Sequence, residues 1–244
     1  MNEITNTTEP QIAYSECYRL PFLSLFHADC IEIMKQYPDK YFDLAIVDPP
    51  YGINAPNMAA TPCQRRNNNK RLNGGSGKLK YRKLNTANCD WDNAVPTDEY
   101  FVELKRISKQ QIIWGGNYFN LPPSRCILCW DKVQPWENFS QVELAWTSFD
   151  SPAQLYRFDN RTGDKIHPTQ KPVQLYEWIL NKYANENFKI LDSHLGSGSI
   201  AIAIDKANTL DKKNLTFVGI ELDPDYFLAA VERFKNYKLQ KTLF

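Results

Sequence analysis

The feature that most constrains the fold of this chain is its alternation of short apolar runs with segments of helical spacing. The expected strands are 22–27, 42–47, 111–114, 189–191 and 215–220. The expected helices are 30–37, 97–108, 172–183, 199–208 and 226–237. Such alternation is typical of an α/β protein whose strands form a mainly parallel sheet with helices on both faces. We therefore predict a doubly wound α/β fold.

Three segments depart from the alternation. The runs 125–131 and 142–147 follow one another without a helix between them, which indicates an antiparallel strand pair. Residues 1–15 are polar and are expected to form a flexible tail, and 54–89 are expected to form a long insertion loop. A chain of 244 residues is within the range of one α/β domain, so we expect a single domain over 16–244.

The insertion loop is strongly basic although the net charge of the whole chain is only +1. No acidic residue lies between Asp48 and Asp90. The basic residues of the loop are Arg65, Arg66, Lys70, Arg71, Lys78, Lys80, Arg82 and Lys83. Loops of this length are usually lids, binding loops or disordered segments. A solvated linker is one interpretation, but the position of the loop directly after a strand end favours an arm that binds phosphates.

Several classes of protein are disfavoured by composition. The N-terminus is polar, and no run approaches the roughly 20 apolar residues of a membrane span, so we expect a cytoplasmic protein without membrane contact. In that compartment the six cysteines are expected to be reduced. Cys126 and Cys129 lie three residues apart on an expected strand and would point to opposite faces. With His167 also lacking nearby ligand residues, we expect no metal site.

The sequence Asp48-Pro49-Pro50-Tyr51 follows the apolar run 42–47. In open α/β sheets ligands bind at the carboxyl ends of strands, where this sequence is expected to lie. The two prolines cannot continue a central strand, and they fix the backbone in one pose. A carboxylate and a fixed carbonyl can accept hydrogen bonds from an amino group, and an aromatic ring can stack on a base. The alternative is that the prolines only end the strand and that Asp48 caps a turn.

A second cluster of candidate residues lies near the C-terminus. Asp192 ends an expected strand and is followed by a turn that contains Gly196 and Gly198, after which a helix begins. The N-terminus of such a helix offers free N–H groups to an anionic ligand group. Glu221 ends the next strand, where an acid can bind both hydroxyls of a ribose. A nicotinamide cofactor and S-adenosylmethionine both fit this outline.

The segment His167-Pro168-Thr169-Gln170-Lys171-Pro172 directly precedes an expected helix. One interpretation is a simple turn with Pro172 at the first helical position. The other is a polar clasp beside the glycine turn, in which Lys171 is available to an acidic group.

Taken in order, these three motifs resemble the amino DNA methyltransferases that depend on S-adenosylmethionine. The base-holding motif precedes the glycine motif, as in the permuted β group, and the resemblance covers most of 24–237. It implies that Asp48, Pro49, Pro50 and Tyr51 hold the target base of double-stranded DNA. The cofactor-binding residues that it implies are Asp29, Asp48, Lys171, Asp192, His194, Gly196, Ser197, Gly198, Glu221 and Leu222. The small size is similar to that of solitary bacterial and phage enzymes.

Two departures from the family pattern affect these expectations. The family usually has Pro-Phe after the acid of the glycine motif, whereas this chain has Ser193-His194. Only 148–166 are available where the family often has a recognition domain, which is too short for an independent domain. We therefore assign most DNA reading to 54–89, with help from 133–138 and 150–166.

Adenine-N6 is favoured over cytosine-N4 as the methylated amine, because Asp at the first motif position is the family's habit for adenine. Rival readings are an enzyme that acts on RNA or a protein amide, a degenerate binding module, and a nicotinamide dehydrogenase. Protein glutamine enzymes, within the first rival, typically carry Asn where Asp48 stands. Against the third, this chain lacks the full glycine fingerprint, since Ala201 replaces the third glycine. A homodimer and a restriction endonuclease partner are left open.

Overall fold

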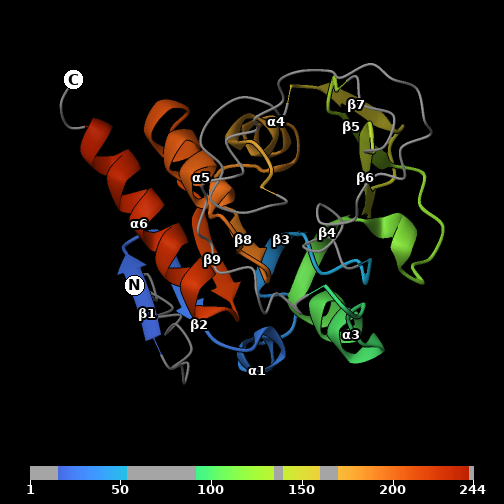
Figure 1. The fold of residues 1–244 in the computed structure, drawn as a ribbon, viewed down its shortest axis with the longest axis horizontal. Coiled ribbons are helices and arrows are strands. Elements are labelled where there is room, and N and C mark those ends of the chain that lie inside the picture. The colour runs from blue at the N-terminus through green and yellow to red at the C-terminus, as the bar shows by residue number, and fades with distance from the viewer. Residues whose placement is uncertain (1–15, 54–91, 135–139, 160–169, 242–244) are drawn as a thin grey trace, which may run out of the picture.

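The computed structural model describes residues 16–53, 92–134, 140–159 and 170–241 (Figure 1). The expected tail at 1–15 and the whole of the basic insertion at 54–89 lie outside these residues. Within the described ranges, no helix combines the length and the apolar character that crossing a membrane demands.

The described strands form one mixed sheet in the order β1-β2-β9-β8-β3-β4-β6-β5-β7. The strands are β1 (Glu16–Leu20), β2 (Leu23–His27), β3 (Phe42–Val47), β4 (Ser108–Trp114), β5 (Ile127–Asp131), β6 (Val142–Thr147), β7 (Gln154–Arg157), β8 (Lys189–Asp192) and β9 (Thr216–Glu221). The central strands β2, β9, β8, β3 and β4 are parallel to one another. The predicted antiparallel pair is confirmed, because Ile127 to Asp131 pair with Trp146 to Val142.

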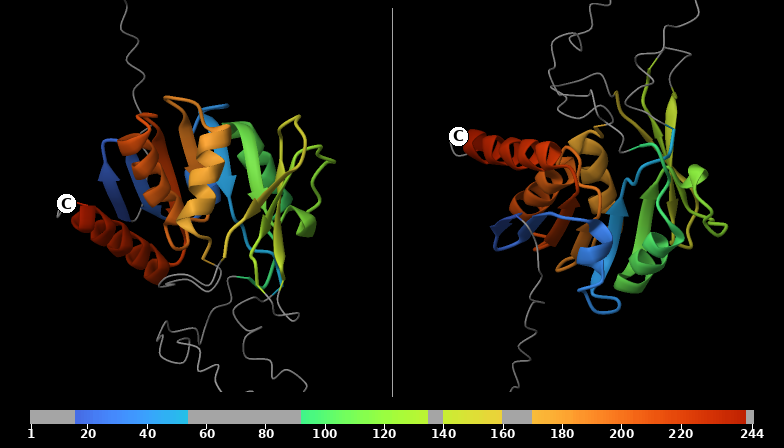
Figure 2. Two further views of the ribbon diagram at one scale, coloured as in Figure 1. Left: turned by 90° about the horizontal axis from the view of Figure 1, so that it is seen from above. Right: turned by 60° about the horizontal axis from the view of Figure 1, so that its bottom comes forward.

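Helices cover both faces of the sheet (Figures 1 and 2). The helices are α1 (Cys30–Met34), α3 (Asp98–Ile107), the short 3-10 helix η3 (Gly116–Tyr118), α4 (Val173–Tyr183), α5 (Ser199–Leu210) and α6 (Pro224–Lys241). In Figure 1, α4, α5 and α6 lie on one side of the sheet, and α1 and α3 lie on the other. The predicted doubly wound α/β fold is therefore confirmed.

The alternation of side chains along β3 explains the two layers of the core. Leu44 and Ile46 belong to the hydrophobic cluster that includes residues of α4, α5 and α6. Ala45 and Val47 belong to the cluster that includes residues of α1 and α3. Successive side chains of a strand point to opposite faces, so a strand buried on both faces must be apolar throughout. The run 42–47 meets this requirement at every position except Asp43, which is half-buried.

Two strands were not expected from the sequence. β1 pairs with β2 in an antiparallel hairpin that turns at Pro21 and Phe22, and β7 adds parallel to β5 at the far edge. Both lie at the edges of the sheet, where side chains are half exposed and an apolar pattern is weak. The expected helix at 30–37 is shorter than predicted and the one at 226–237 is longer.

Candidate active site

The acids selected from the sequence meet at one edge of the sheet. β2, β9, β8 and β3 are adjacent and parallel, so their carboxyl ends lie side by side. Glu221 and Asp192 are the last residues of β9 and β8, while Asp29 and Asp48 follow β2 and β3 closely. In open α/β sheets this edge is where ligands bind.

Asp48 uses both of its carboxylate oxygens. Oδ1 accepts a hydrogen bond of 2.6 Å from the hydroxyl of Tyr51, and Oδ2 forms an ion pair with Nζ of Lys171. The ammonium of Lys171 also lies 3.3 Å from the Tyr51 hydroxyl oxygen. Asp48, Tyr51 and Lys171 therefore form one compact polar cluster at the end of β3.

Lys171 is 3% exposed, and a second carboxylate lies beside it. Its Nζ is 3.2 Å from Oε2 of Glu143 on β6, and Oε1 of Glu143 forms an ion pair with Lys132, which directly follows β5. Two acids and two lysines thus alternate along a line from Asp48 to Lys132. We call Asp48, Lys171, Glu143 and Lys132 the charged tetrad.

Burial and neighbouring charges together set the pKa values of Asp48, Glu143 and Lys171. Burial raises the pKa of Asp48, and the nearby Lys171 ammonium offsets part of that rise. Burial also favours a higher pKa for Glu143, but the positive charges of Lys171 and Lys132 bring that pKa below its usual value. Burial alone would lower the pKa of Lys171, yet Asp48 and Glu143 hold it above the usual value. Lys171 is therefore a stable buried cation at neutral pH.

The ring of Tyr51 is fixed by aromatic neighbours and by a glycine. It stacks on Tyr118 with centroids 5.0 Å apart and an interplanar angle of 14°, and it meets Phe119 edge-on. A Cβ on Gly115 would lie 2.2 Å from Cε1 of Tyr51, so only glycine leaves room for the ring. One face of Tyr51 is therefore already covered by Tyr118, which is itself 44% exposed.

The turn after Pro50 is fixed by Asp92. Its Oδ1 accepts hydrogen bonds from the backbone N–H groups of Tyr51 at 2.6 Å and Gly52 at 2.9 Å. Asp92 is only 1% exposed, so these are buried contacts. They join the base-holding motif to the segment that leads into α3.

At the second cluster, Glu221 is held by the backbone. Its Oε2 accepts from the N–H of Gly196 at 2.7 Å, and its Oε1 accepts from the N–H of Asp223 at 3.0 Å. Gly196 and Gly198 have φ values of +51° and +68°, which favour glycine. Arg233 of α6 donates to the carbonyl oxygen of Ser197 at 2.8 Å and so supports the same turn.

Ser193 and His194, which replace the family's usual pair, are part of a buried network. The Ser193 hydroxyl lies 2.7 Å from the Tyr100 hydroxyl oxygen and 2.9 Å from Nδ1 of His194. The rings of Tyr100 and His194 pack edge to face. Burial lowers the pKa of His194 to about 4 and raises the pKa of Asp192 to about 8. Burial therefore favours the uncharged form of both groups.

The remaining candidates fall into three groups. Asp29 caps α1 by accepting from the N–H groups of Ile31 and Glu32, which matches a structural role as well as a binding one. Leu222 is 66% exposed beside Glu221. Residues 167–169 lie outside the described residues, as do all eight basic residues that the sequence selected as DNA-binding.

Lys171 is available to acidic groups, as the sequence suggests. Its hydrogen bonds and ion pairs in the described structure are with Asp48, Tyr51 and Glu143. These partners belong to the base-holding motif and to β6. The structure therefore associates Lys171 with the Asp48 corner.

Sequence reasoning missed five residues at this edge. They are Asp92, Gly115, Tyr118, Lys132 and Glu143. A signal existed for one of them, since Glu143 is an acid inside the otherwise apolar strand segment 142–146. An acid in such a strand is either at an exposed position or paired, and pairing across strands is not visible in one sequence.

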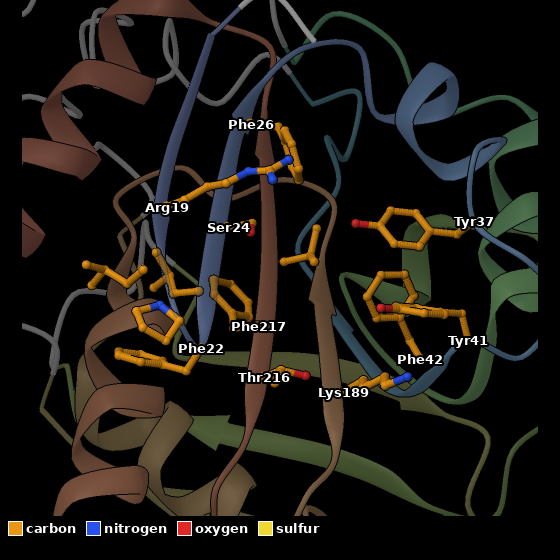
Figure 3. Close-up of a pocket in the computed structure, with 14 residues that line it drawn as sticks. Arg19, Phe22, Ser24, Phe26, Tyr37, Tyr41, Phe42, Lys189, Thr216 and Phe217 are labelled. Atoms are coloured by element: carbon orange, nitrogen blue, oxygen red, sulfur yellow. The ribbon is translucent and has the colours of Figure 1, made fainter. Parts of the chain in front are cut away.

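A cavity of about 190 Å³ lies away from these residues (Figure 3). Its lining includes Phe42, Lys189 and Thr216, which are the first residues of β3, β8 and β9. The carboxylates described above are at the opposite ends of the same strands. The candidate functional residues therefore lie at the carboxyl edge and not at this cavity.

The sheet and the glycine turn at its carboxyl edge define a Rossmann-like fold of the DNA methyltransferase type. The structure of M1.HpyAVI in complex with S-adenosylmethionine aligns with a TM-score of 0.52 and 18% identity, over 86% of this chain and 99% of that one. The cytosine-N4-specific PvuII DNA methyltransferase aligns with a TM-score of 0.55 and 13% identity, over 91% and 90% of the two chains. At these identities the likeness concerns the fold.

Residues 78–232, well over half of the chain, match the N6_N4_Mtase family model, described as DNA methylase. The chain belongs to this family. The matched range contains Lys171, the glycine turn and Glu221, whereas Asp48 to Tyr51 precede it.

Two curated relatives are type II methyltransferases. M2.LlaDCHI of Lactococcus lactis subsp. cremoris is 27% identical over 146 residues, which are 60% of this chain and 49% of the relative. M2.DpnII of Streptococcus pneumoniae is 26% identical over the same shares of the two chains. This chain therefore spans about half the length of the curated relatives that it matches.

Proposed function

We propose that this chain is a site-specific DNA methyltransferase. It transfers a methyl group from S-adenosylmethionine to the exocyclic amine of adenine, at N6, in a base flipped out of duplex DNA. The observation that carries the proposal is the placement of Asp48 and Tyr51 at the same sheet edge as the glycine turn and Glu221. Membership of the DNA methylase family supports it.

The residues of the glycine turn fit this cofactor. Glu221 is fixed by two backbone N–H groups, and each of its oxygens keeps a further lone pair for a ribose hydroxyl. Leu222 offers an exposed apolar surface beside it, as the adenine ring of the cofactor requires. In the proposal Asp29, Asp192, His194, Gly196, Ser197 and Gly198 complete the cofactor site. When bound, S-adenosylmethionine supplies an electrophilic methyl group on a sulfonium.

Asp48 acts on the amine of the target base. That nitrogen is a weak nucleophile because its lone pair is delocalised into the ring. Hydrogen bonds from its two N–H groups to Asp48 and to the carbonyl oxygen of Pro49 favour a more pyramidal nitrogen with a localised lone pair. The amine gains positive charge during transfer, and the Asp48 carboxylate stabilises that charge in a site where burial strengthens electrostatic interactions. Positioning of the two reactants supplies much of the remaining rate enhancement.

The amine is not accessible inside a duplex, so the base must be extruded at a cost of a few kcal/mol. Stacking on an aromatic side chain returns about 1–3 kcal/mol per base. Tyr51 provides the ring, and Tyr118 behind it keeps that ring in place. In this proposal the basic residues between Arg65 and Lys83 bind phosphates and make affinity depend on salt.

The test uses Asp48→Ala with radiolabelled cofactor and duplex DNA of mixed sequence. We expect methyl transfer to be lost while cofactor binding, measured by calorimetry, stays near the wild-type value. Transfer by the variant at the wild-type rate would refute the role of Asp48.

Chromatography of the labelled nucleosides from the wild-type reaction identifies the product. N6-methyladenine supports the proposal, and N4-methylcytosine assigns the enzyme to the other amine.

A second variant tests the basic loop. Neutralising Arg65, Arg66, Lys70 and Arg71 to Gln is expected to weaken DNA binding and flatten its dependence on salt. Each lost phosphate contact reduces the slope of log K against log salt by about 0.9. Fluorescence anisotropy at several salt concentrations measures this slope. An unchanged slope would remove these residues from the DNA interface.

A further inference from the structure

We propose that Glu143 is a positioning residue that receives the ammonium of Lys171 when the amine of the target base takes the place of Lys171 at Asp48. The inference deepens the proposed function and rests on it. Glu143 lies on β6, outside the motifs that suggested the function, and it is linked to Asp48 by the ammonium of Lys171.

The incoming amine meets a carboxylate whose two oxygens already have donors. Oδ1 of Asp48 accepts from Tyr51, and Oδ2 is paired with Lys171. Each oxygen keeps a further lone pair, but Tyr51 and Lys171 lie directly against this buried carboxylate, so we infer that an amine that hydrogen-bonds to Asp48 replaces one of them. Lys171 is the donor with an alternative, because its Nζ is already 3.2 Å from Oε2 of Glu143. The hydroxyl proton of Tyr51 has no second acceptor among the hydrogen bonds of the described residues.

Because Lys171 is buried, its ammonium group needs a hydrogen-bond acceptor close by. The side chain of Lys171 is 2% exposed, and those of Asp48 and Glu143 are 18% and 19% exposed. An ammonium that left Asp48 without another partner would be an unpaired buried charge, which is strongly unfavourable. Rotation of the flexible lysine stem toward Glu143 keeps the charge paired, so the exchange needs no movement of the backbone.

The balance of two acids and two lysines in the tetrad allows Lys171 to move between Asp48 and Glu143. Lys132 neutralises part of the charge on Glu143, so Glu143 attracts Lys171 without trapping it before the base arrives. Once Lys171 has moved, Asp48 faces the amine as a free carboxylate. It can then stabilise the positive charge that develops during methyl transfer.

The titratable groups around Asp48 come from several elements. They are Tyr51, Tyr100 on α3, Lys132, Glu143 on β6, Lys171, Tyr176 on α4 and Asp192 on β8. The tyrosines have raised pKa values and remain protonated in the neutral range. Lys171 lowers the pKa of Asp48 and Glu143 raises it. Removing one or the other should therefore shift the titration of Asp48 in opposite directions.

The experiment compares Glu143→Gln with Lys171→Met. Base flipping is measured by the fluorescence of 2-aminopurine placed next to the target adenine, which keeps its own 6-amino group, and kcat/KM is measured against pH. For Glu143→Gln we expect flipping to weaken by about tenfold or more, because Lys171 stays on Asp48. In Glu143→Gln the acidic limb of the plot of kcat/KM against pH should move to lower pH. In Lys171→Met the same limb should move to higher pH. Cofactor affinity should be unchanged in Glu143→Gln.

A double variant isolates the coupling. When Lys171 is already Met, adding Glu143→Gln should have little further effect on flipping, since the group that Glu143 receives is gone. Asp205→Asn is the matched control, because Asp205 is also a buried acid that binds a lysine, Lys238, and a tyrosine, Tyr237. Asp205 is on α5, and both of its partners are on α6. The Asp205→Asn substitution should therefore leave base flipping and the acidic limb of the kcat/KM profile unchanged.

The outcomes separate the two proposals. A wild-type protein that methylates no DNA overturns the proposed function and this inference with it. If the wild type is active but Glu143→Gln flips normally and keeps the wild-type acidic limb, only the role of Glu143 is overturned. Additive effects in the double variant would also overturn it, because a structural role would not depend on Lys171.

Discussion

The two halves of the carboxyl edge hold their acids in different ways. Asp48 is bound by the side chains of Tyr51 and Lys171, whereas Glu221 is bound by the backbone N–H groups of Gly196 and Asp223. Side chains can rotate and exchange partners, but backbone donors within a tight turn cannot do so without unfolding the turn. The glycine-turn half is therefore suited to a constant ligand, and the Asp48 half to a group that enters and leaves.

This difference corresponds to the two ligands of the proposed reaction. A cofactor presents the same ribose in every cycle, so a fixed acceptor such as Glu221 binds it without reorganisation. A flipped base enters a site where a buried carboxylate already has donors, and in the proposal it replaces one of them. The ion pairs around Lys171 supply replaceable donors while keeping every buried charge compensated.

The largest expected effect comes from neutralising the acid of each half. Asp48→Asn should reduce kcat by about 10²–10³-fold with little change in cofactor affinity, because it removes stabilisation of developing charge. Glu221→Gln should mainly weaken cofactor binding. Single-turnover rates at saturating cofactor, together with calorimetric titration, separate the two. If both variants lost cofactor affinity equally, the division of the edge into two functions would be wrong.

Next in size is a comparison of two glycines with similar backbone angles. Gly115 and Gly198 have φ values of +69° and +68°, so alanine is strained at both. The added Cβ would lie 2.2 Å from Tyr51 Cε1 at Gly115 but 3.2 Å from Ala230 Cβ at Gly198. We expect Gly115→Ala to lose about 1–3 kcal/mol more unfolding free energy than Gly198→Ala, because only it overpacks a ring. Urea denaturation of both variants measures the difference, and equal losses would contradict the fixed placement of Tyr51.

A smaller effect is expected at Asp92. Asp92→Ala removes the acceptor for two buried N–H groups and should lower the free energy of unfolding by about 1–3 kcal/mol. Because those groups belong to Tyr51 and Gly52, 2-aminopurine flipping should weaken while cofactor affinity is kept. Asp150→Asn, which alters an exposed acid paired with Arg125, is the control for stability. Loss of cofactor affinity in Asp92→Ala would show that the glycine-turn half of the edge depends on the structure of the Asp48 half.

The smallest effect concerns pH and the glycine-turn half. The pKa of His194 is about 4 in the folded protein, below the 6.5 of an exposed histidine. Protonation therefore favours the unfolded chain, and His194 reduces stability as pH falls from about 6.5 toward 4. In His194→Phe this contribution is absent, so unfolding free energies at pH 7 and pH 5 should differ less than in the wild type. An equal pH dependence in both proteins would mean that His194 titrates normally.

Strong local patterns explain which elements were predicted correctly. The run 42–47 is apolar because β3 is buried on both faces, and Tyr100, Leu104 and Ile107 of α3 repeat at helical spacing because they pack on the sheet. β1 and β7 were missed because edge strands bury little and so carry a weak pattern. The expected helix 97–108 begins one residue later, at Asp98, and the side chain of Thr97 makes no capping hydrogen bond.

The sequence by itself determined the alternation of strands and helices, the acids at the strand ends and the glycines of the turn. These features depend on spacing within one segment, and burial and backbone geometry leave a direct mark on such spacing. Only the tertiary structure decided that Lys171 lies between Asp48 and Glu143, that Asp92 holds the turn after Pro50, and that Tyr118 stacks on Tyr51. Such contacts join elements far apart in the chain, and they form because a buried charge or N–H group must find a partner across the sheet.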